Sequence, residues 1–109
     1  MTYKARKGRV RRVTPWSHQL EGDIWDCRRD LALLHTQILN ERSAVETWQR
    51  RLGERVAYER RYRCTSQIPM LRQECAAAHT RLLELEKRLI NAQVRLRFLL
   101  AEQRASERP

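Results

Sequence analysis

The sequence predicts an all-α protein: a long antiparallel coiled-coil hairpin of two helices, or a small bundle made by oligomerisation of such hairpins, with a flexible basic N-terminal arm. Three observations predict this class. Charged residues make up 33% of the 109 residues and aromatic residues 6%. Glycine and proline number three each, so residues that break helices are scarce. Apolar residues recur at heptad spacing in two long stretches, as in coiled-coil helices.

Residues 1–16 form the predicted basic arm, which contains no acidic residue. Repulsion between charges at this density opposes compact folding, so we expect the arm to be flexible when free. We interpret it as an anion-binding arm, and the alternative is a disordered solubilising or targeting tail. Thr14 and Pro15 suit the N-cap and first position of a helix, and a start near Asp23 is the alternative. The candidate anion ligands of the arm are Lys4, Arg6, Lys7, Arg9, Arg11 and Arg12.

A helical coiled-coil hairpin is expected over residues 17–109, with its first helix over about 17–63. Nine of ten heptad positions there are apolar, against about four expected by chance at a hydrophobic content of 41%. Glu41 is the exception, and we expect a basic side chain of the partner to pair with it. The repeat fails after Leu52, beside Gly53, which predicts a stutter, bend or fraying over 53–60. The positions are Leu20, Ile24, Cys27, Leu31, Leu34, Ile38, Glu41, Val45, Trp48 and Leu52.

The second helix is expected over about residues 68–106, where all ten heptad positions are apolar. They are Ile68, Leu71, Cys75, Ala78, Leu82, Leu85, Leu89, Ala92, Leu96 and Leu99. Further apolar residues lie outside this seam, so the stripe is wider than one partner helix covers. We therefore predict a protein partner, a homo-oligomer, or both, docked on Leu82, Leu83, Leu85, Leu89, Ile90, Leu96, Phe98 and Leu99.

Thr65, Ser66 and Pro69 indicate a break between the two helices, because proline lacks a backbone donor and disfavours helical geometry at the residue before it. A reversal of the chain about residue 65 places Trp48 near Leu83. The alternative is one nearly continuous helix, kinked at the proline, that pairs in a parallel dimer.

A second basic segment spans residues 48–63, where Trp48, Tyr58 and Tyr62 alternate with arginines. Arginine and aromatic side chains together are typical of the strongest contacts in protein interfaces. They are also compatible with a solvated helix tip, in which tyrosine rings pack on arginine stems. A third interpretation is a nucleic-acid site, where arginine binds phosphate and rings stack on bases. The candidate anion ligands are Arg50, Arg51, Arg55, Arg60, Arg61 and Arg63.

Catalytic constellations are lacking in the sequence, so we expect no enzyme, no cofactor and no small-molecule substrate. His79 follows Cys75 by one helical turn, but zinc needs further ligands, so we predict no metal and assign Cys75 to the apolar seam. The odd number of cysteines, three, indicates a reducing and cytoplasmic compartment. Neither a membrane span nor a secretory signal is predicted.

The net charge is +10, and arginine supplies 20 of the 23 basic residues. We expect an assembly or adaptor subunit that docks a protein through an apolar helix face and an anionic surface through its basic segments. The alternative is a nucleic-acid-binding phage, viral or regulatory protein that uses the arm and the second basic segment. In architecture the chain is similar to the basic coiled-coil stalk subunits of flagellar and type III secretion ATPases, which are two-helix hairpins inserted into a hexameric ring. That resemblance implies a stalk role.

Overall fold

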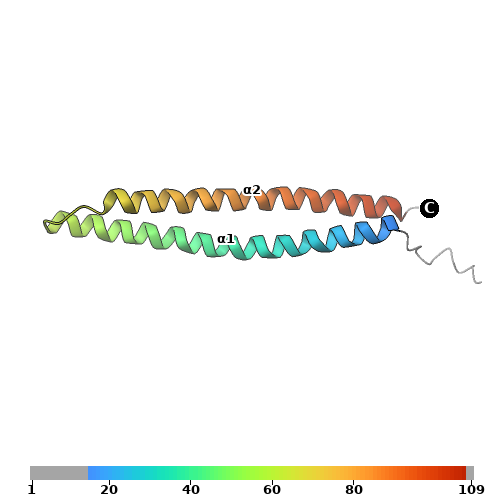
Figure 1. Ribbon diagram of the computed structural model, residues 1–109, viewed down its shortest axis with the longest axis horizontal. Helices are drawn as coiled ribbons and strands as arrows, with labels where there is room; N and C mark the ends of the chain where they lie inside the picture. Colours follow the sequence, from blue (N-terminus) through green and yellow to red (C-terminus); the bar gives the residue numbers. More distant parts are fainter. Residues whose placement is uncertain (1–14, 108–109) are drawn as a thin grey trace, which may run out of the picture. The chain divides into compact units, whose positions relative to one another are not determined.

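A computed structural model describes residues 15–107, and this part of the chain contains two helices and no strand. Helix α1 spans Pro15–Arg61 and helix α2 spans Ile68–Ser106. The two helices lie side by side and run in opposite directions (Figure 1). The predicted all-α antiparallel hairpin is confirmed, and the alternative of one nearly continuous kinked helix is wrong.

Helix α1 begins at Pro15, as expected for the first helical position, so it takes in the last two residues of the predicted arm, and the alternative start near Asp23 is wrong. Proline suits the first helical position because its ring sets a helical φ and because the N–H that it lacks has no partner there. Residues 1–14 lie outside the described residues, so the flexibility of the arm and its binding of anions stay predictions. This applies to Lys4, Arg6, Lys7, Arg9, Arg11 and Arg12.

Contacts between the helices divide the hairpin into two units. The terminal unit comprises residues 1–31 and 91–109, of which 15–31 and 91–107 are described, and the loop unit comprises residues 32–90. In the terminal unit, the Cys27 thiol donates a hydrogen bond to the Ala92 carbonyl oxygen, with 3.3 Å between sulfur and oxygen. The buried side chains of this unit are all from predicted heptad positions: Leu20, Ile24, Cys27 and Leu99, with Leu96 and Leu100 packed against them.

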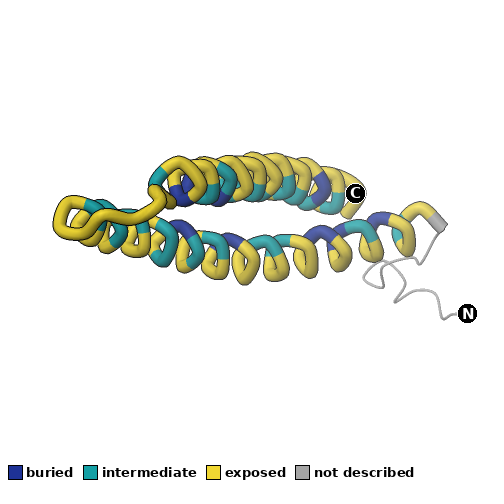
Figure 2. The backbone as a smooth tube through the Cα atoms, turned by 60° about the vertical axis from the view of Figure 1, so that its left-hand side comes forward, coloured by how far each residue is buried: buried dark blue, intermediate teal, exposed yellow. Residues whose placement is uncertain are grey.

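The core of the loop unit is small. Its buried side chains are Ile38, Val45, Leu71, Cys75 and Ala78. Other seam leucines of this unit, such as Leu34 and Leu52, are only half-buried. A single neighbouring helix covers one side of each leucine and leaves the other side to solvent. Figure 2 shows exposed segments on the outer sides of both helices.

The register of the two helices differs from that of a simple reversal about residue 65. Gln49, the neighbour of Trp48, lies 3.1 Å from His79, about one helical turn before Leu83, near which Trp48 was expected, and Trp48 itself lines a groove with Leu71. The reason is the path of the connection: residues 62–67 run back along the last turns of α1 before α2 begins (Figure 1). The end of α1 therefore packs against the loop and not against α2.

Helix α1 continues without interruption through residues 53–60, so the predicted fraying is wrong. Arg55 and Glu59, where the apolar repeat stops, form an ion pair of 2.8 Å between Nε and Oε2. Their side chains are only 21% and 12% exposed, although they do not belong to the apolar seam between the helices. Elsewhere along α1, the apolar seam packs against α2. At Arg55 and Glu59, polar contacts with the loop take the place of that packing.

Candidate functional site

The connecting loop is held to α1 by a small polar network around Arg55 and Glu59. The backbone N–H of Gln67 donates to Glu59 Oε2 at 2.8 Å, and Arg55 Nη2 donates to the Thr65 carbonyl oxygen at 3.0 Å. Hydrogen bonds from the Ser66 hydroxyl and then from the Gln67 N–H hold the pKa of the Glu59 carboxyl below its ordinary value, with a smaller contribution from Arg55. We call residues 50–67, with this network, the tip of the hairpin.

The tip places the predicted anion ligands in two different settings. Arg55 is used by the loop network, and Arg51 lies over the Trp48 ring, 5.1 Å from its centroid. Within the described part of the chain, the remaining four arginines of the segment are exposed and form no ion pair. They are Arg50, Arg60, Arg61 and Arg63. The structure therefore leaves four of the six predicted side chains available to an external anion.

Aromatic side chains lie beside these arginines. Tyr58 and Tyr62, both exposed, have ring centroids 4.9 Å apart and planes tilted by 41°. Arg55 also contacts the face of the Tyr58 ring, at 4.7 Å from the centroid. A groove of about 490 Å³ at the tip is lined by Trp48, Arg51, Glu54, Arg55, Tyr58, Gln67, Met70 and Leu71. Trp48 and Tyr58 thus share one groove, and Tyr62 is outside it.

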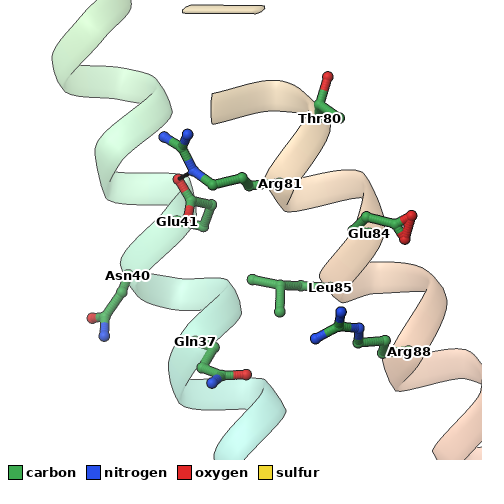
Figure 3. A pocket seen from close by; sticks show the side chains of 8 residues that line it. All are labelled: Gln37, Asn40, Glu41, Thr80, Arg81, Glu84, Leu85 and Arg88. Atoms are coloured by element: carbon green, nitrogen blue, oxygen red, sulfur yellow. Dashed lines mark hydrogen bonds and ion pairs between the residues drawn. The ribbon is translucent and has the colours of Figure 1, made fainter. Parts of the chain in front are cut away.

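A second groove, of about 480 Å³, lies on one side of the loop unit (Figure 3). Glu41 is the polar seam residue here, and its Oε2 accepts a hydrogen bond from Arg81 Nε at 3.2 Å. The expected basic partner of Glu41 is thus supplied by the same chain. Leu85 points toward α1 at the floor of this polar groove (Figure 3). The lining residues are Gln37, Asn40, Glu41, Thr80, Arg81, Glu84, Leu85 and Arg88.

The other side of the loop unit is apolar. Leu39, Leu83 and Ile90 are 64%, 59% and 57% exposed. Arg42 and Glu86 form an ion pair of 3.5 Å across the two helices. Leu39 lies one turn before Arg42. Leu83 lies one turn before Glu86, and Ile90 lies one turn after it. These three apolar side chains are therefore on the same side of the loop unit as the ion pair. We call this surface the apolar flank.

The predicted docking residues on α2 separate into two groups. Leu82, Leu85, Leu89 and Leu96 are half-buried and Leu99 is buried, so the hairpin itself covers them in part. Leu83 and Ile90 in the loop unit, and Phe98 in the terminal unit, are exposed. This second group offers a partner the larger exposed surface without opening the hairpin.

Several exposed apolar side chains on α1 lie outside the predicted set of docking residues. Leu39 belongs to the apolar flank, and in the terminal unit Trp16 and Trp25 are 58% and 63% exposed. The guanidinium of Arg29 lies over the Trp25 ring, 5.2 Å from its centroid. The signal that identifies such residues is an apolar side chain at a heptad position beside the seam, because that position is turned away from the partner helix.

The cysteine and histidine residues do not form a common site. Cys75 is buried in the seam, as predicted, whereas His79 is exposed and its Nε2 lies 3.1 Å from Nε2 of Gln49. Cys27, Cys64 and Cys75 are all free thiols. Among residues 15–107, no three His, Cys, Asp or Glu side chains gather in a way that would hold a metal ion.

No protein-family model, curated protein or solved structure matches this chain. Within the described residues, neither helix has a stretch that is long and apolar enough to cross a membrane.

Proposed function

We propose that this chain is a non-enzymatic assembly or adaptor subunit. It docks a protein partner through the apolar flank, and its basic tip faces an anionic surface. The observation that carries the proposal is that Leu39, Leu83 and Ile90 lie together on one side of the loop unit and are each more than half exposed. Apolar side chains gathered in this way are typical of surfaces that another protein covers.

The magnitudes support an extended contact. Full burial of a leucine or isoleucine side chain contributes about 1.5–3 kcal/mol. Since each of the three is already partly covered, docking adds roughly 3–5 kcal/mol from them together. Association costs at least about 4 kcal/mol in lost translational and rotational freedom, so the three residues form the centre of a larger interface.

The apolar flank is tested by Leu83→Glu with Ile90→Glu in the tagged full-length chain. We expect the double variant to lose the proteins that the unaltered chain retains after cross-linking in its native cells, as identified by mass spectrometry. The matched control is Gln73→Glu with Asn91→Glu, which adds the same charge at exposed positions of α2 away from the flank. Equal recovery by both double variants would contradict the proposal.

Substitutions in the seam do not test docking. Leu85 and Leu89 are half-buried, and Leu85 points toward α1 (Figure 3). An aspartate at either position replaces an apolar side chain of the seam with a charge between the helices and destabilises the hairpin itself. Loss of binding in such a variant therefore reports unfolding.

Nucleic-acid binding is a second candidate function, and one observation favours it. Four arginines at the tip are without an ion pair in the described part of the chain, and they flank the Tyr58–Tyr62 pair. Arginine forks bind phosphate oxygens, and tyrosine rings stack on bases of single strands. The tip thus has the two side-chain types that a single-stranded nucleic acid requires.

A salt series tests this second candidate. The binding of a fluorescent single-stranded oligonucleotide is measured by anisotropy, for the unaltered chain and for the triple variant Arg60→Gln, Arg61→Gln, Arg63→Gln. For every phosphate that the variant no longer binds, the slope of log affinity against log salt should become shallower by about 0.7. The matched control removes three exposed arginines of the terminal unit: Arg95→Gln, Arg97→Gln and Arg104→Gln. Absence of binding at low salt would exclude this function.

A further inference from the structure

The apolar flank is electrically balanced, on a chain whose net charge is +10. Arg42 and Glu86 mark this side of the loop unit through their ion pair. Glu46 follows Leu39 by one heptad, and Arg72 precedes Glu86 by two heptads, so these residues lie on the same side. The flank thus carries two arginines and two glutamates around its apolar residues. By contrast, the tip, residues 50–67, contains six arginines and two glutamates.

We propose that the apolar flank is covered by a second copy of this chain, so that two hairpins pack flank to flank as a four-helix bundle. This inference rests on the proposed function and names the partner of its apolar surface. In such a bundle, Leu39, Leu83 and Ile90 of both copies form a new apolar layer. The half-buried leucines of the seam, which one helix covers incompletely, are then covered more fully.

Charge favours a second copy as the occupant. Two chains of net charge +10 repel each other wherever their arginine-rich surfaces meet. Their approach is least opposed at the flank, because positive and negative side chains are equal in number there. A contact around a two-fold axis brings the same patch from both copies together, so the patch must complement itself. Arg42 and Glu86 meet this requirement, since the Arg42 of one copy can pair with the Glu86 of the other.

The size of the flank is also adequate. Residues 32–53 of α1 extend for about 33 Å, and two adjacent helices are about 20 Å across. This side of the two helices therefore measures about 650 Å² in projection, of the same order as the roughly 800 Å² of accessible surface that each partner buries in a stable interface of standard size. The flank therefore offers enough surface for a dimer, although three apolar side chains alone would not stabilise one.

The first measurement is the mass of the full-length chain in solution, by multi-angle light scattering from about 1 µM to about 1 mM. The proposal predicts a mass of twice 13.1 kDa at the upper concentrations. Leu83→Glu with Ile90→Glu should shift the protein to the monomer, while Gln73→Glu with Asn91→Glu stays dimeric. Circular dichroism verifies that each variant keeps its helices.

A mixing experiment keeps the proposal testable if the glutamate variant unfolds. In a dimer of the Arg42→Glu variant, a glutamate at position 42 of one copy faces Glu86 of the other. In a dimer of the Glu86→Arg variant, an arginine at position 86 of one copy faces Arg42 of the other. Each variant should dimerise at least about tenfold more weakly than the unaltered chain at low salt. Mixing the two should restore the dimer, because each copy then meets the opposite charge. The ion pair within each chain stays broken in the mixture, so recovery reports contacts between copies.

A monomer over the whole concentration range would overturn the second copy as the occupant, and docking of a different protein would still stand. A dimer that persists in a folded Leu83→Glu, Ile90→Glu variant would show that the interface lies elsewhere, as would a mixture that remains monomeric. Recovery of the cross-linked proteins that is as complete in the Leu83→Glu, Ile90→Glu variant as in its control would instead contradict the proposed docking role. The two proposals therefore fail in different experiments.

Discussion

Charged residues at heptad positions have two different roles in this chain. Glu41 lies among apolar positions and pairs with Arg81 of the opposite helix. Arg55 and Glu59 lie where α1 extends past the start of α2, and they bind the backbone of the loop. Glu41 is satisfied across the hairpin, by a residue 40 positions away, whereas Arg55 and Glu59 are satisfied by each other and by loop residues 8 to 10 positions later.

Glu59 should make the stability of the tip dependent on pH. Its folded pKa lies below the ordinary value of 4.5, so its contribution is present above that value and is lost as the pH falls through the lower folded pKa. We expect Glu59→Gln to lower the midpoint of chemical denaturation at pH 7 and to differ little from the unaltered chain well below pH 4.5. Glu54→Gln, on the preceding turn and exposed, is the control and should show no such dependence.

Replacement of Glu41 by leucine should stabilise the hairpin. The glutamate side chain is 17% exposed and lies beside Leu85 in the polar groove, so an apolar side chain there joins the seam. Arg81 is 51% exposed and remains hydrated without its partner. We expect Glu41→Leu to raise the free energy of unfolding by about 1 kcal/mol, measured by urea denaturation. A decrease would show that the ion pair contributes more than apolar packing.

At the scale of the helices, Gly53 is a weak point of α1. It lies inside a continuous helix, and a Cβ added to it would meet no atom within 4 Å. Alanine loses less conformational entropy than glycine when a helix forms, so Gly53→Ala should stabilise the protein by about 0.5–1 kcal/mol. The reverse change at a nearby exposed position, Ala57→Gly, should destabilise it by a similar amount. The free energy of unfolding of both variants is measured by urea denaturation.

Ala78 lies in the buried seam between the helices of the loop unit. It is completely buried, and it is the smallest residue among those of that core. We expect Ala78→Leu to lower the free energy of unfolding by about 1–3 kcal/mol, because the helices must separate to admit the larger side chain. Ala101→Leu, at an exposed position of α2, is the control for the change in residue type. An unchanged stability for Ala78→Leu would mean that the seam repacks freely.

For the whole molecule, the proposed dimer links stability to concentration. Ligands that bind only the folded state raise the apparent stability by mass action, and a second copy is such a ligand. The melting temperature followed by circular dichroism should therefore rise with protein concentration. The Leu83→Glu, Ile90→Glu variant should lose this dependence and keep the melting temperature of the isolated hairpin. A melting temperature independent of concentration in the unaltered chain would argue against the dimer.

Much of the fold was predictable because the signals are local. Heptad spacing identified every buried residue described here, and Pro15 and Pro69 lie at the first turn of each helix. The candidate sites were less predictable. Leu83 and Leu85 are equally apolar and two residues apart, yet the first is exposed beside the seam and the second points toward α1. Composition does not distinguish these two leucines. Their heptad positions do, because Leu85 is a seam position and Leu83 is not.

The sequence by itself determined the helical class, the extent of both helices and the positions that pack between them, since helix periodicity and capping depend on neighbouring residues. Only the tertiary structure decided the register, because residues 62–67 return along α1 through bonds to Arg55 and Glu59. It also decided which arginines of the tip are already used. These outcomes depend on contacts between residues far apart in sequence, whose pairing changes with the path of a single loop.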